Sequence, residues 1–507
     1  MDAVRRWRDP APGRRLRLNP RTGRIAPHMP ALALTRPRIA RRATTAAAAA
    51  AGATLARALA ALLATALATA EPAAAAEPWS APAAVPGSPA TAPTVAFNAG
   101  GVGVLTGDTG GGASSGAVGP NTVGALADDA DGFPGPITAF TATNFALGNR
   151  LALYGLGRIV GMGTHFSSAD DRAGIVFGDA GDKLTNVHFV GPTDRPGAAQ
   201  ALAANTRGDV AATFGVCNNG ACAHQSLFLV VRRSGGSVQS SLRMDNVAVR
   251  NLSTVAINDR GDMLVAWQAN GGVFARIRTA GGTLYDTERL GNPGEPVRAI
   301  SAVLTPNRGA AVAWEAQSVD EGTPESPATV DASTKAAGAS HHFRSSQRLG
   351  RVPTLATGQY VGERAVKVVR SADGRITAAW TAFAADRFVV QAAGLSGARF
   401  RTGVTVSDPA VDSILADLDA GPSSELAVAW RTGVAGTDAG TGTPGLSAAL
   451  RSPGGSAFAA PEAIEQGAAA FDPTLRFDPS SGAVVTAWND LASMRTATRP
   501  ALVPPSG

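Results

Sequence analysis

The 507-residue sequence has few of the residues that build catalytic and metal centres: six His, two Cys and three Tyr. The His residues are scattered, so their spacing defines no Ser–His–Asp set. His341 and His342 are adjacent, and neighbours in an extended strand point to opposite faces, so they cannot chelate one ion together. The Gly-rich run from Gly107 to Gly119 lacks the Lys of a phosphate loop. We therefore predict no catalytic residues, no metal ligands and no cofactor.

Basic charge is concentrated at one end of the chain. The formal net charge is +6, but twelve Arg lie between Arg5 and Arg42. Without residues 1–70 the chain keeps 32 basic and 37 acidic side chains, a net charge of −5. A mildly acidic protein does not attract phosphate backbones in general, so we expect no nucleic-acid partner.

The N-terminal region has the parts of a secretory signal. Arg41 and Arg42 precede an Ala- and Leu-rich stretch over residues 43–70, and small-residue cleavage patterns end at Ala70 and Ala76. A membrane-spanning helix is the alternative, but Arg57 and the weak hydrophobicity of Ala count against it. We expect residues 1–76 to be an N-terminal extension and signal peptide. The mature protein would then be secreted or at the cell surface, with no membrane span.

The two cysteines, Cys217 and Cys222, flank Asn219-Gly220, a dipeptide typical of a two-residue hairpin turn. Such a turn would place the two cysteines opposite each other on antiparallel strands, close enough for a disulfide. A disulfide agrees with an oxidising compartment. The alternative is two free thiols in a surface loop.

One segment recurs along the chain as strand, tight turn and strand. Thr254–Trp267 (TVAINDRGDMLVAW) is the clearest copy, Thr94–Gly107 is an early copy, and a degraded copy is predicted at Ala169–Phe177. The clear copies end at an aromatic anchor: Phe214, Trp267, Trp314, Trp380, Trp430 and Trp488. The flanking runs are apolar on both faces, which predicts sheets covered on both sides.

A second strand–turn–strand pair follows most copies, so the repeat is four short antiparallel strands. Units of this kind and length are typical of propeller blades. We predict an all-β fold, a single β-propeller of residues 77–507. Seven blades fit best, and six or eight remain open. Insertions are expected near residues 108–166 and 315–338.

The two ends of the repeat region predict how the ring closes. Too little chain follows Trp488 for a complete blade, and Trp79–Val85 (WSAPAAV) is similar to the outer strand Phe458–Ile464 (FAAPEAI). We predict that Trp79–Val85 pairs as the outermost strand of the last blade and removes its exposed edge. The alternative is a Pro- and Ala-rich linker.

The turn Ser371-Ala372-Asp373-Gly374, followed by Trp380, resembles the Asp-box hairpins of sialidases and related secreted propellers. The spacing to Trp differs, and most copies lack the Asp, so the resemblance covers the hairpins only and implies fold alone. A sialidase would need an arginine cluster, a Tyr nucleophile and acidic partners. The available candidates are Tyr154, Tyr285, Tyr360 and Arg158.

The favoured function is a non-enzymatic, exported scaffold that binds a ligand, glycan or protein partner on one face or at the central channel. Loops on rigid scaffolds commonly carry such functions. The alternative is a sialidase-like or other extracellular carbohydrate-active hydrolase, which would gather Asp, Glu, Arg and Tyr at one mouth of the channel. We expect the protein to be a monomer.

Overall fold

The computed structural model describes residues 78–502 apart from several segments, of which the longest are 109–121, 318–327 and 353–365. The chain divides into residues 1–75 and 76–507, and everything described here belongs to the second part. The predicted leader lies outside the described residues. All described elements are β-strands, as the sequence predicts. Over these residues no helix is long and apolar enough to cross a membrane.

The strands group into antiparallel four-stranded sheets, numbered here as blades in chain order from the first complete hairpin. Blade 1 contains β2 (Thr94–Phe97), β3 (Gly103–Asp108), β4 (Thr122–Ala127) and β5 (Thr138–Ala139). Blade 2 contains β6 (Phe145–Ala146) and β7 (Leu151–Tyr154) side by side with β8 (Arg158–His165), then β9 (Arg172–Asp179) and β10 (Val187–Phe189). Blade 3 contains β11 (Gly197–Ala204), β12 (Val210–Cys217), β13 (Gln225–Arg232) and β14 (Leu242–Arg243). Blade 4 contains β15 (Val249–Ile257), β16 (Met263–Ala269), β17 (Gly272–Arg278) and β18 (Glu288–Arg289).

The second half of the ring repeats this arrangement. Blade 5 contains β19 (Val297–Leu304), β20 (Ala310–Gln317), β21 (Ala328–Lys335) and β22 (Gln347–Val352). Blade 6 contains β23 (Val366–Arg370), β24 (Ile376–Ala384), β25 (Arg387–Ser396) and the short outer strands β26 (Arg399–Phe400) and β27 (Val404–Thr405). Blade 7 contains β28 (Ser413–Ala420), β29 (Leu426–Thr432), β30 (Gly445–Arg451) and β31 (Glu462–Gln466). Blade 8 contains β32 (Phe471–Phe477), β33 (Val484–Asn489), β34 (Met494–Arg499) and β1 (Ala83–Ala84).

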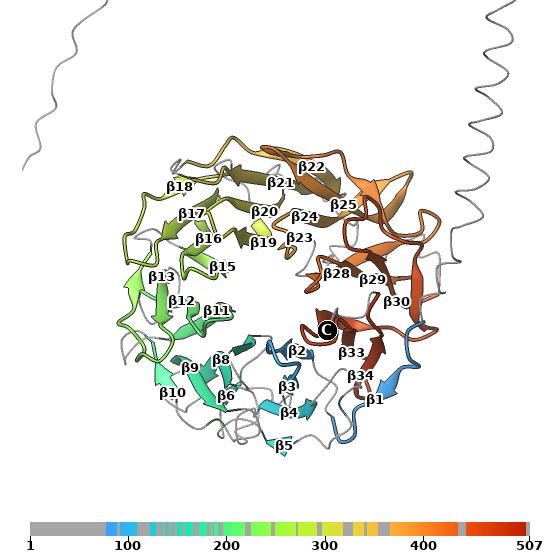
Figure 1. Cartoon of the computed structure of the whole chain (residues 1–507), viewed down its shortest axis with the longest axis horizontal. Coiled ribbons are helices and arrows are strands. Elements are labelled where there is room, and N and C mark those ends of the chain that lie inside the picture. Colours follow the sequence, from blue (N-terminus) through green and yellow to red (C-terminus); the bar gives the residue numbers. More distant parts are fainter. Residues whose placement is uncertain are drawn as a thin grey trace, which may run out of the picture. The chain divides into compact units, whose positions relative to one another are not determined.

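The blades stand in a ring, and strands β2, β11, β15, β19, β23 and β28 lie nearest its centre (Figure 1). Blades 3 and 4 share one sheet through a single pair, Gln225 with Val249. Counted as four-stranded units, the described strands form eight blades, one more than the sequence favoured. The predicted copy at Ala169–Phe177 is not a first hairpin, because β9 is the third strand of a separate blade whose first hairpin is β7–β8.

The cores lie between the blades. The buried apolar residues of the described chain form eight clusters, each built mainly from two neighbouring blades. The aromatic anchors sit in second strands and are at most 1% exposed. Each packs against the preceding blade; Trp380, for example, lies with Ala313 and Val330 of blade 5. Apolar area removed from water stabilises these contacts at about 25 cal/mol per Å².

Strand β1 closes the ring. Ala83 and Ala84 pair with Thr496 and Arg495 of β34. The pairing continues beyond the strand through bonds from Ser80 N–H to Thr498 O (2.7 Å) and from Val85 N–H to Met494 O (2.9 Å). The predicted closure by residues 79–85 is therefore confirmed.

The two ends of this segment are buried on different sides of blade 8. Trp79 packs in the cluster shared with blade 7, whereas Val85 packs in the cluster shared with blade 1. The N-terminal segment thus completes two of the inter-blade cores as well as one sheet.

Both expected insertions contain blade strands. Strands β4 to β8 fall within residues 108–166, and β21 falls within 315–338. The sequence interpretation missed these strands because their residues are rich in Gly, Ala and Thr, with little of the alternation that marks half-buried strands.

The hairpin predicted at the cysteines exists, but its register differs. Cys217 lies opposite Gln225, so the connection from β12 to β13 is longer than a two-residue turn at Asn219-Gly220. Cys217 is buried, and Cys222 lies outside the described residues. The disulfide stays a prediction.

Replacing Trp79 with Ala is expected to lower the free energy of unfolding by about 3 kcal/mol, because truncation of a buried aromatic leaves a cavity and loses its apolar contacts. Chemical denaturation of the purified protein measures the loss, and hydrogen exchange should rise along β34. Trp79→Phe, which keeps most of the apolar contact, serves as the control. Equal stability of the Ala and Phe variants would show that the closing segment does not depend on this side chain.

Candidate functional site

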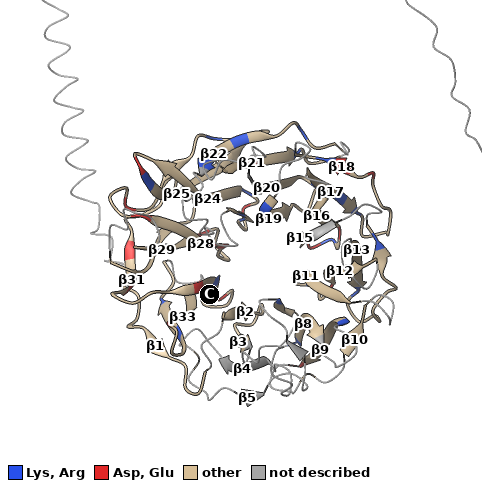
Figure 2. Ribbon diagram, turned by 180° about the vertical axis from the view of Figure 1, so that it is seen from behind, with Lys and Arg blue, Asp and Glu red and all other residues tan. Residues whose placement is uncertain are grey.

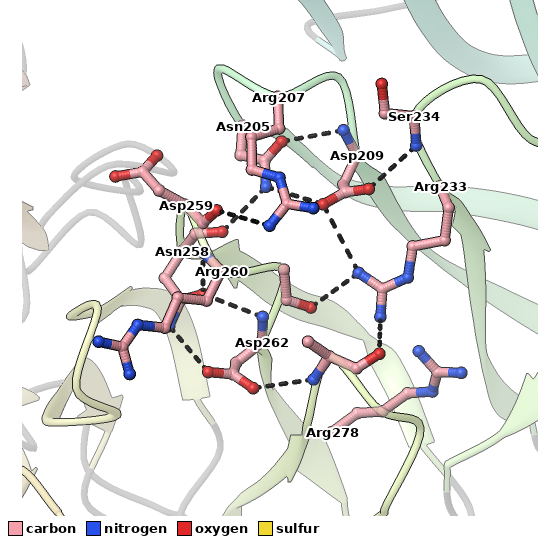
Figure 3. Close-up of polar contacts among 12 residues, drawn as sticks. Asn205, Arg207, Asp209, Arg233, Ser234, Asn258, Asp259, Arg260, Asp262 and Arg278 are labelled. Carbon is pink, nitrogen blue, oxygen red and sulfur yellow. Dashed lines mark hydrogen bonds and ion pairs between the residues drawn. The ribbon is translucent and has the colours of Figure 1, made fainter.

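The turns between first and second strands are joined from blade to blade by side-chain amides. In blade 3, Asn205 Oδ1 accepts from Asp209 N–H (2.9 Å), and its Nδ2 donates to Asp209 Oδ2 (3.1 Å) and to Asn258 O of blade 4 (2.9 Å). Asn258 makes the same two hydrogen bonds with Asp262, and its Nδ2 also donates to Thr305 O of blade 5 (2.9 Å). Figure 3 shows the contacts among Asn205, Asp209, Asn258 and Asp262.

Arginines fill the spaces between these turns. Arg233 donates to Gly261 O (3.0 Å) and Ala280 O (2.7 Å) and lies 3.7 Å from Asp209. Burial by itself would raise the pKa of Asp262, but hydrogen bonds from Ala280 N–H, Asn258 and Arg308 hold that pKa below its ordinary value. These charges are satisfied within the protein, so this network is a scaffold and not a binding site.

A second polar arrangement lies on the inner strands, at one repeat position. In each of blades 3 to 8, one residue of the first strand pairs with the residue just before the aromatic anchor. In blade order these first-strand residues are Ala201, Thr254, Ser301, Lys367, Asp417 and Thr474. Three of these side chains, those of Ser301, Lys367 and Asp417, contact the next blade. Ser301 Oγ accepts from Val368 N–H (2.9 Å), and Asp417 Oδ2 accepts from Leu475 N–H (3.2 Å).

Asp417 is the one carboxylate at this position, and it is enclosed. Its side chain is 2% exposed and meets Lys367 at 3.3 Å and Arg476 at 2.7 Å. Thr474 Oγ1 also donates to it (3.3 Å). A buried carboxylate is costly unless it is paired and hydrogen-bonded, and here two cations and two backbone N–H groups, those of Leu475 and Leu418, supply the partners.

Asp419, two residues further along β28, has the opposite environment. Burial raises its pKa and Asp417 adds to the rise, while Arg476 and the N–H of Phe477 oppose it. Its Oδ2 accepts from Phe477 N–H (2.9 Å). Two carboxyl groups with different surroundings are a feature of general acid–base sites. Here, however, both carboxyl groups accept hydrogen bonds from backbone N–H groups of β32.

A groove lies between blades 6 and 7. It has a volume of about 710 Å³, within the range of ligand sites. One wall is the start of β24, the end of β25 and β27; the other is the end of β30 and residues 454–461, which lead into β31. Most of the described ring is uncharged (Figure 2).

Three arginines and no carboxylates line this groove: Arg375, Arg401 and Arg451. Asp373 lies beside it and pairs with Arg375 at 3.2 Å. Burial lowers the pKa of Arg451, and the charge of Arg375 lowers it further against the opposing effect of Asp373. One adjacent carboxylate does not balance three guanidinium groups, so the groove favours an anion.

The remaining lining offers an aromatic ring and hydroxyl groups. The Arg451 guanidinium lies 5.7 Å from the centroid of the Phe458 ring. Val404, 66% exposed, adds apolar surface. Thr405 and Ser456 are exposed at the groove and can exchange hydrogen bonds with a hydroxylated ligand.

Comparison of the blades explains why this groove is positive. A basic residue recurs at the end of the third strand, opposite the first residue of the second strand: Arg232, Arg278, Lys335, Arg451 and Arg499. In blade 8, Arg499 forms a bidentate pair with Glu462 on the outer strand of blade 7 (both 2.9 Å).

Val404 occupies the repeat position of Glu462 one blade earlier. Val404 and Glu462 each pair with an Ala of the third strand. That Ala in turn pairs with the second-strand residue just before the Trp anchor. Blade 6 thus has a valine where blade 7 has the carboxylate that neutralises its neighbour's arginine. The sequence interpretation missed this site, although the recurring Arg at the ends of the third strands was a visible signal.

The residues considered for a sialidase-like site do not meet in the described structure. Tyr154 accepts a hydrogen bond from Arg232 (2.6 Å) at blades 2 and 3, and Tyr285 accepts one from Arg308 (3.0 Å) at blades 4 and 5. Arg158 lies 3.6 Å from Asp179 within blade 2. Tyr360 lies outside the described residues.

His342 lies 3.5 Å from Glu288, and His341 is outside the described residues. Over the described ranges, no group of three His, Cys, Asp or Glu converges on a position for a metal ion.

No known protein family and no curated protein matches the sequence. Among solved structures, the WD40 domain of SCAP from fission yeast is 10% identical, with a TM-score of 0.42 over 84% of this chain and 98% of that one. An α-L-arabinanase from Penicillium chrysogenum, complexed with arabinobiose, is 10% identical, with a TM-score of 0.39 over 84% and 99%. A Dyadobacter fermentans protein of unknown function is 12% identical, with a TM-score of 0.36 over 63% and 99%. The propeller fold follows from this chain's own strand order, and the chemistry of the groove has to be read from its own residues.

A further buried carboxyl group lies on β20. Glu315 is 4% exposed. Burial raises its pKa to about 7, although the charge of Arg298 works in the opposite direction. The folded protein therefore holds this proton at pH values where the unfolded chain has lost it.

Glu315→Gln is expected to stabilise the protein at neutral pH. Since the folded pKa is raised, stability falls as the pH rises from about 4.5 to about 7. The Gln variant lacks this fall, so its advantage should be absent near pH 4 and reach about 3 kcal/mol above pH 7. Denaturant unfolding at both pH values measures it, with the exposed Asp286→Asn as control. An advantage that does not change with pH would contradict the prediction.

Proposed function

We infer that this protein is a binding scaffold and that the groove between blades 6 and 7 takes an acidic glycan. The observation that carries the inference is the lining of three arginines with no carboxylate, beside the ring of Phe458. Guanidinium groups bind carboxylate and sulfate through paired N–H donors. An apolar ring face and hydroxyl groups suit a pyranose, so the combination favours a sugar acid over a simple anion.

The repeat comparison gives the physical reason for binding. At the next interface Glu462 neutralises Arg499, whereas Val404 offers Arg451 no carboxylate at the matching repeat position. A bound carboxylate would relieve the repulsion between Arg375 and Arg451. In this proposal the ligand's anionic group takes the place that a protein carboxylate holds one blade later.

A carbohydrate-active hydrolase remains the second candidate, favoured by Asp417 and Asp419 on β28. Such enzymes need two carboxyl groups that flank the scissile bond. Asp417 is instead enclosed by Lys367 and Arg476 and bonded to β32, which favours a structural role. A panel of fluorogenic glycosides decides between them: turnover that disappears in Asp419→Asn would support the hydrolase.

We also propose that the protein acts outside the cell as a monomer, after removal of the leader. The support is the sequence pattern of residues 43–76 and the place of Trp79 in the folded core, three residues beyond Ala76. N-terminal sequencing of the exported protein should begin after Ala70 or Ala76. A first residue beyond Trp79 would contradict the proposal, because the closing strand would be lost.

Val404→Glu is expected to abolish binding of oligogalacturonate while leaving the fold intact. The new carboxylate would stand where Glu462 stands in blade 7 and pair with Arg451. Arg451→Gln should weaken the same binding about tenfold to a hundredfold, the range for one charge-assisted hydrogen bond. Calorimetric titration with a galacturonate disaccharide measures both, and binding should weaken with added salt.

Two neutral variants serve as matched controls. Val404→Gln has the size of the Glu variant without its charge, and Arg278→Gln removes the arginine at the same repeat position of blade 4, away from the groove. Both should bind the disaccharide as the unaltered protein does. Equal binding by the Glu and Gln variants at position 404, or equal affinity for the methyl-esterified disaccharide, would overturn the proposal.

A further inference from the structure

A second groove lies one blade earlier, between blades 5 and 6. It has a volume of about 310 Å³, and its lining includes Thr334, Arg344, Gln347 and Arg399. Like the larger groove it contains two or more arginines and no carboxylate in its lining. It was not part of the site described above.

Only the β25–β26 hairpin separates the two grooves. Ala398 and Arg399 line the smaller one, whereas Gly394, Leu395 and Arg401 line the larger one. Leu395 pairs with Phe400 and Ser396 with Arg399, so the separating element is a single tight turn. The grooves are therefore neighbours on the two sides of one hairpin.

This hairpin is held firmly by blade 5. Gln347 donates to Phe400 O (2.8 Å) and accepts from Phe400 N–H (3.0 Å). Thr334 Oγ1 donates to Ala398 O (2.6 Å). Because Gln347 and Thr334 themselves line the smaller groove, its shape is formed before any ligand binds, which lowers the entropic cost of binding.

We propose that the ligand is a linear polyanionic glycan that crosses the β25–β26 hairpin and occupies both grooves at once, with Arg344 and Arg399 forming a second anionic subsite. This inference rests on the proposed function of the larger groove. Regularly spaced charges on a polymer would meet arginines on both sides of the hairpin. A ligand held at two linked points gains affinity from the high effective concentration of its second point.

The test compares short and long ligands on the whole protein. A galacturonate disaccharide fits one groove, whereas a decasaccharide can reach both. The decasaccharide should bind at least about tenfold more tightly than the disaccharide. Combined replacement of Arg344 and Arg399 by Gln should remove this advantage and leave disaccharide binding unchanged. Arg289→Gln, an exposed arginine on the outer strand of blade 4, is the matched control.

The outcomes separate this proposal from the one on which it rests. If the double variant binds the decasaccharide as tightly as the unaltered protein, the smaller groove is not a subsite and this inference is overturned. If neither ligand binds the unaltered protein, the proposed function itself fails. Preferential binding of single-stranded DNA or polyphosphate of similar length would identify a different polyanion and overturn both proposals.

Discussion

Both faces of each blade are apolar, and this constraint governs the rest of the structure. A strand such as β16 is buried along its whole length, so its sheet has no face that can stand in water. Each blade therefore needs a neighbour on both sides, and a row of such sheets is stable only when it closes on itself. Pairing of β1 with β34 provides that closure, and Trp79 and Val85 complete the cores on its two sides.

Polar contacts then fix how neighbouring blades are placed. Asn205 and Asn258 carry hydrogen bonds from one turn to the next, and inner-strand side chains do the same nearer the centre of the ring. The same positions recur, so a residue type can change in one blade while the contact it makes survives. Asp417 shows this, because it keeps the bond that Ser301 makes but needs two cations to offset its buried charge.

Function is proposed at an interface where the recurring basic residue has an apolar residue, and no carboxylate, at the facing repeat position. The basic residue at the end of the third strand of blade 8 pairs with a carboxylate of blade 7. At the interface between blades 6 and 7, Val404 occupies the position of that carboxylate. Because the interfaces between blades are built from equivalent repeat positions, a residue that differs at one interface can be recognised by comparison with the next interface. The resulting positive groove is a local property of two blades, and the mildly acidic composition of the chain beyond residue 70 does not reveal it.

Local patterns in the sequence determined the class of this fold. The Trp-ending hairpins, their two-sided apolar strands and the Trp79–Val85 segment predicted a closed propeller, because turn chemistry and strand periodicity act over a few residues. The sequence left the blade count open between six and eight, and the position of Cys217 in its hairpin was misjudged, since Gly- and Ala-rich strands such as β8 and a seven-residue connection carry weak local signals. Arg375, Arg401 and Arg451 could not be joined from sequence, because they lie far apart along the chain: Arg375 just before β24, Arg401 between β26 and β27, and Arg451 at the end of β30. Only the packing of blade 6 against blade 7 brings them to one groove, because the spacing between blades is set by the cores between them and not by the chain that links them.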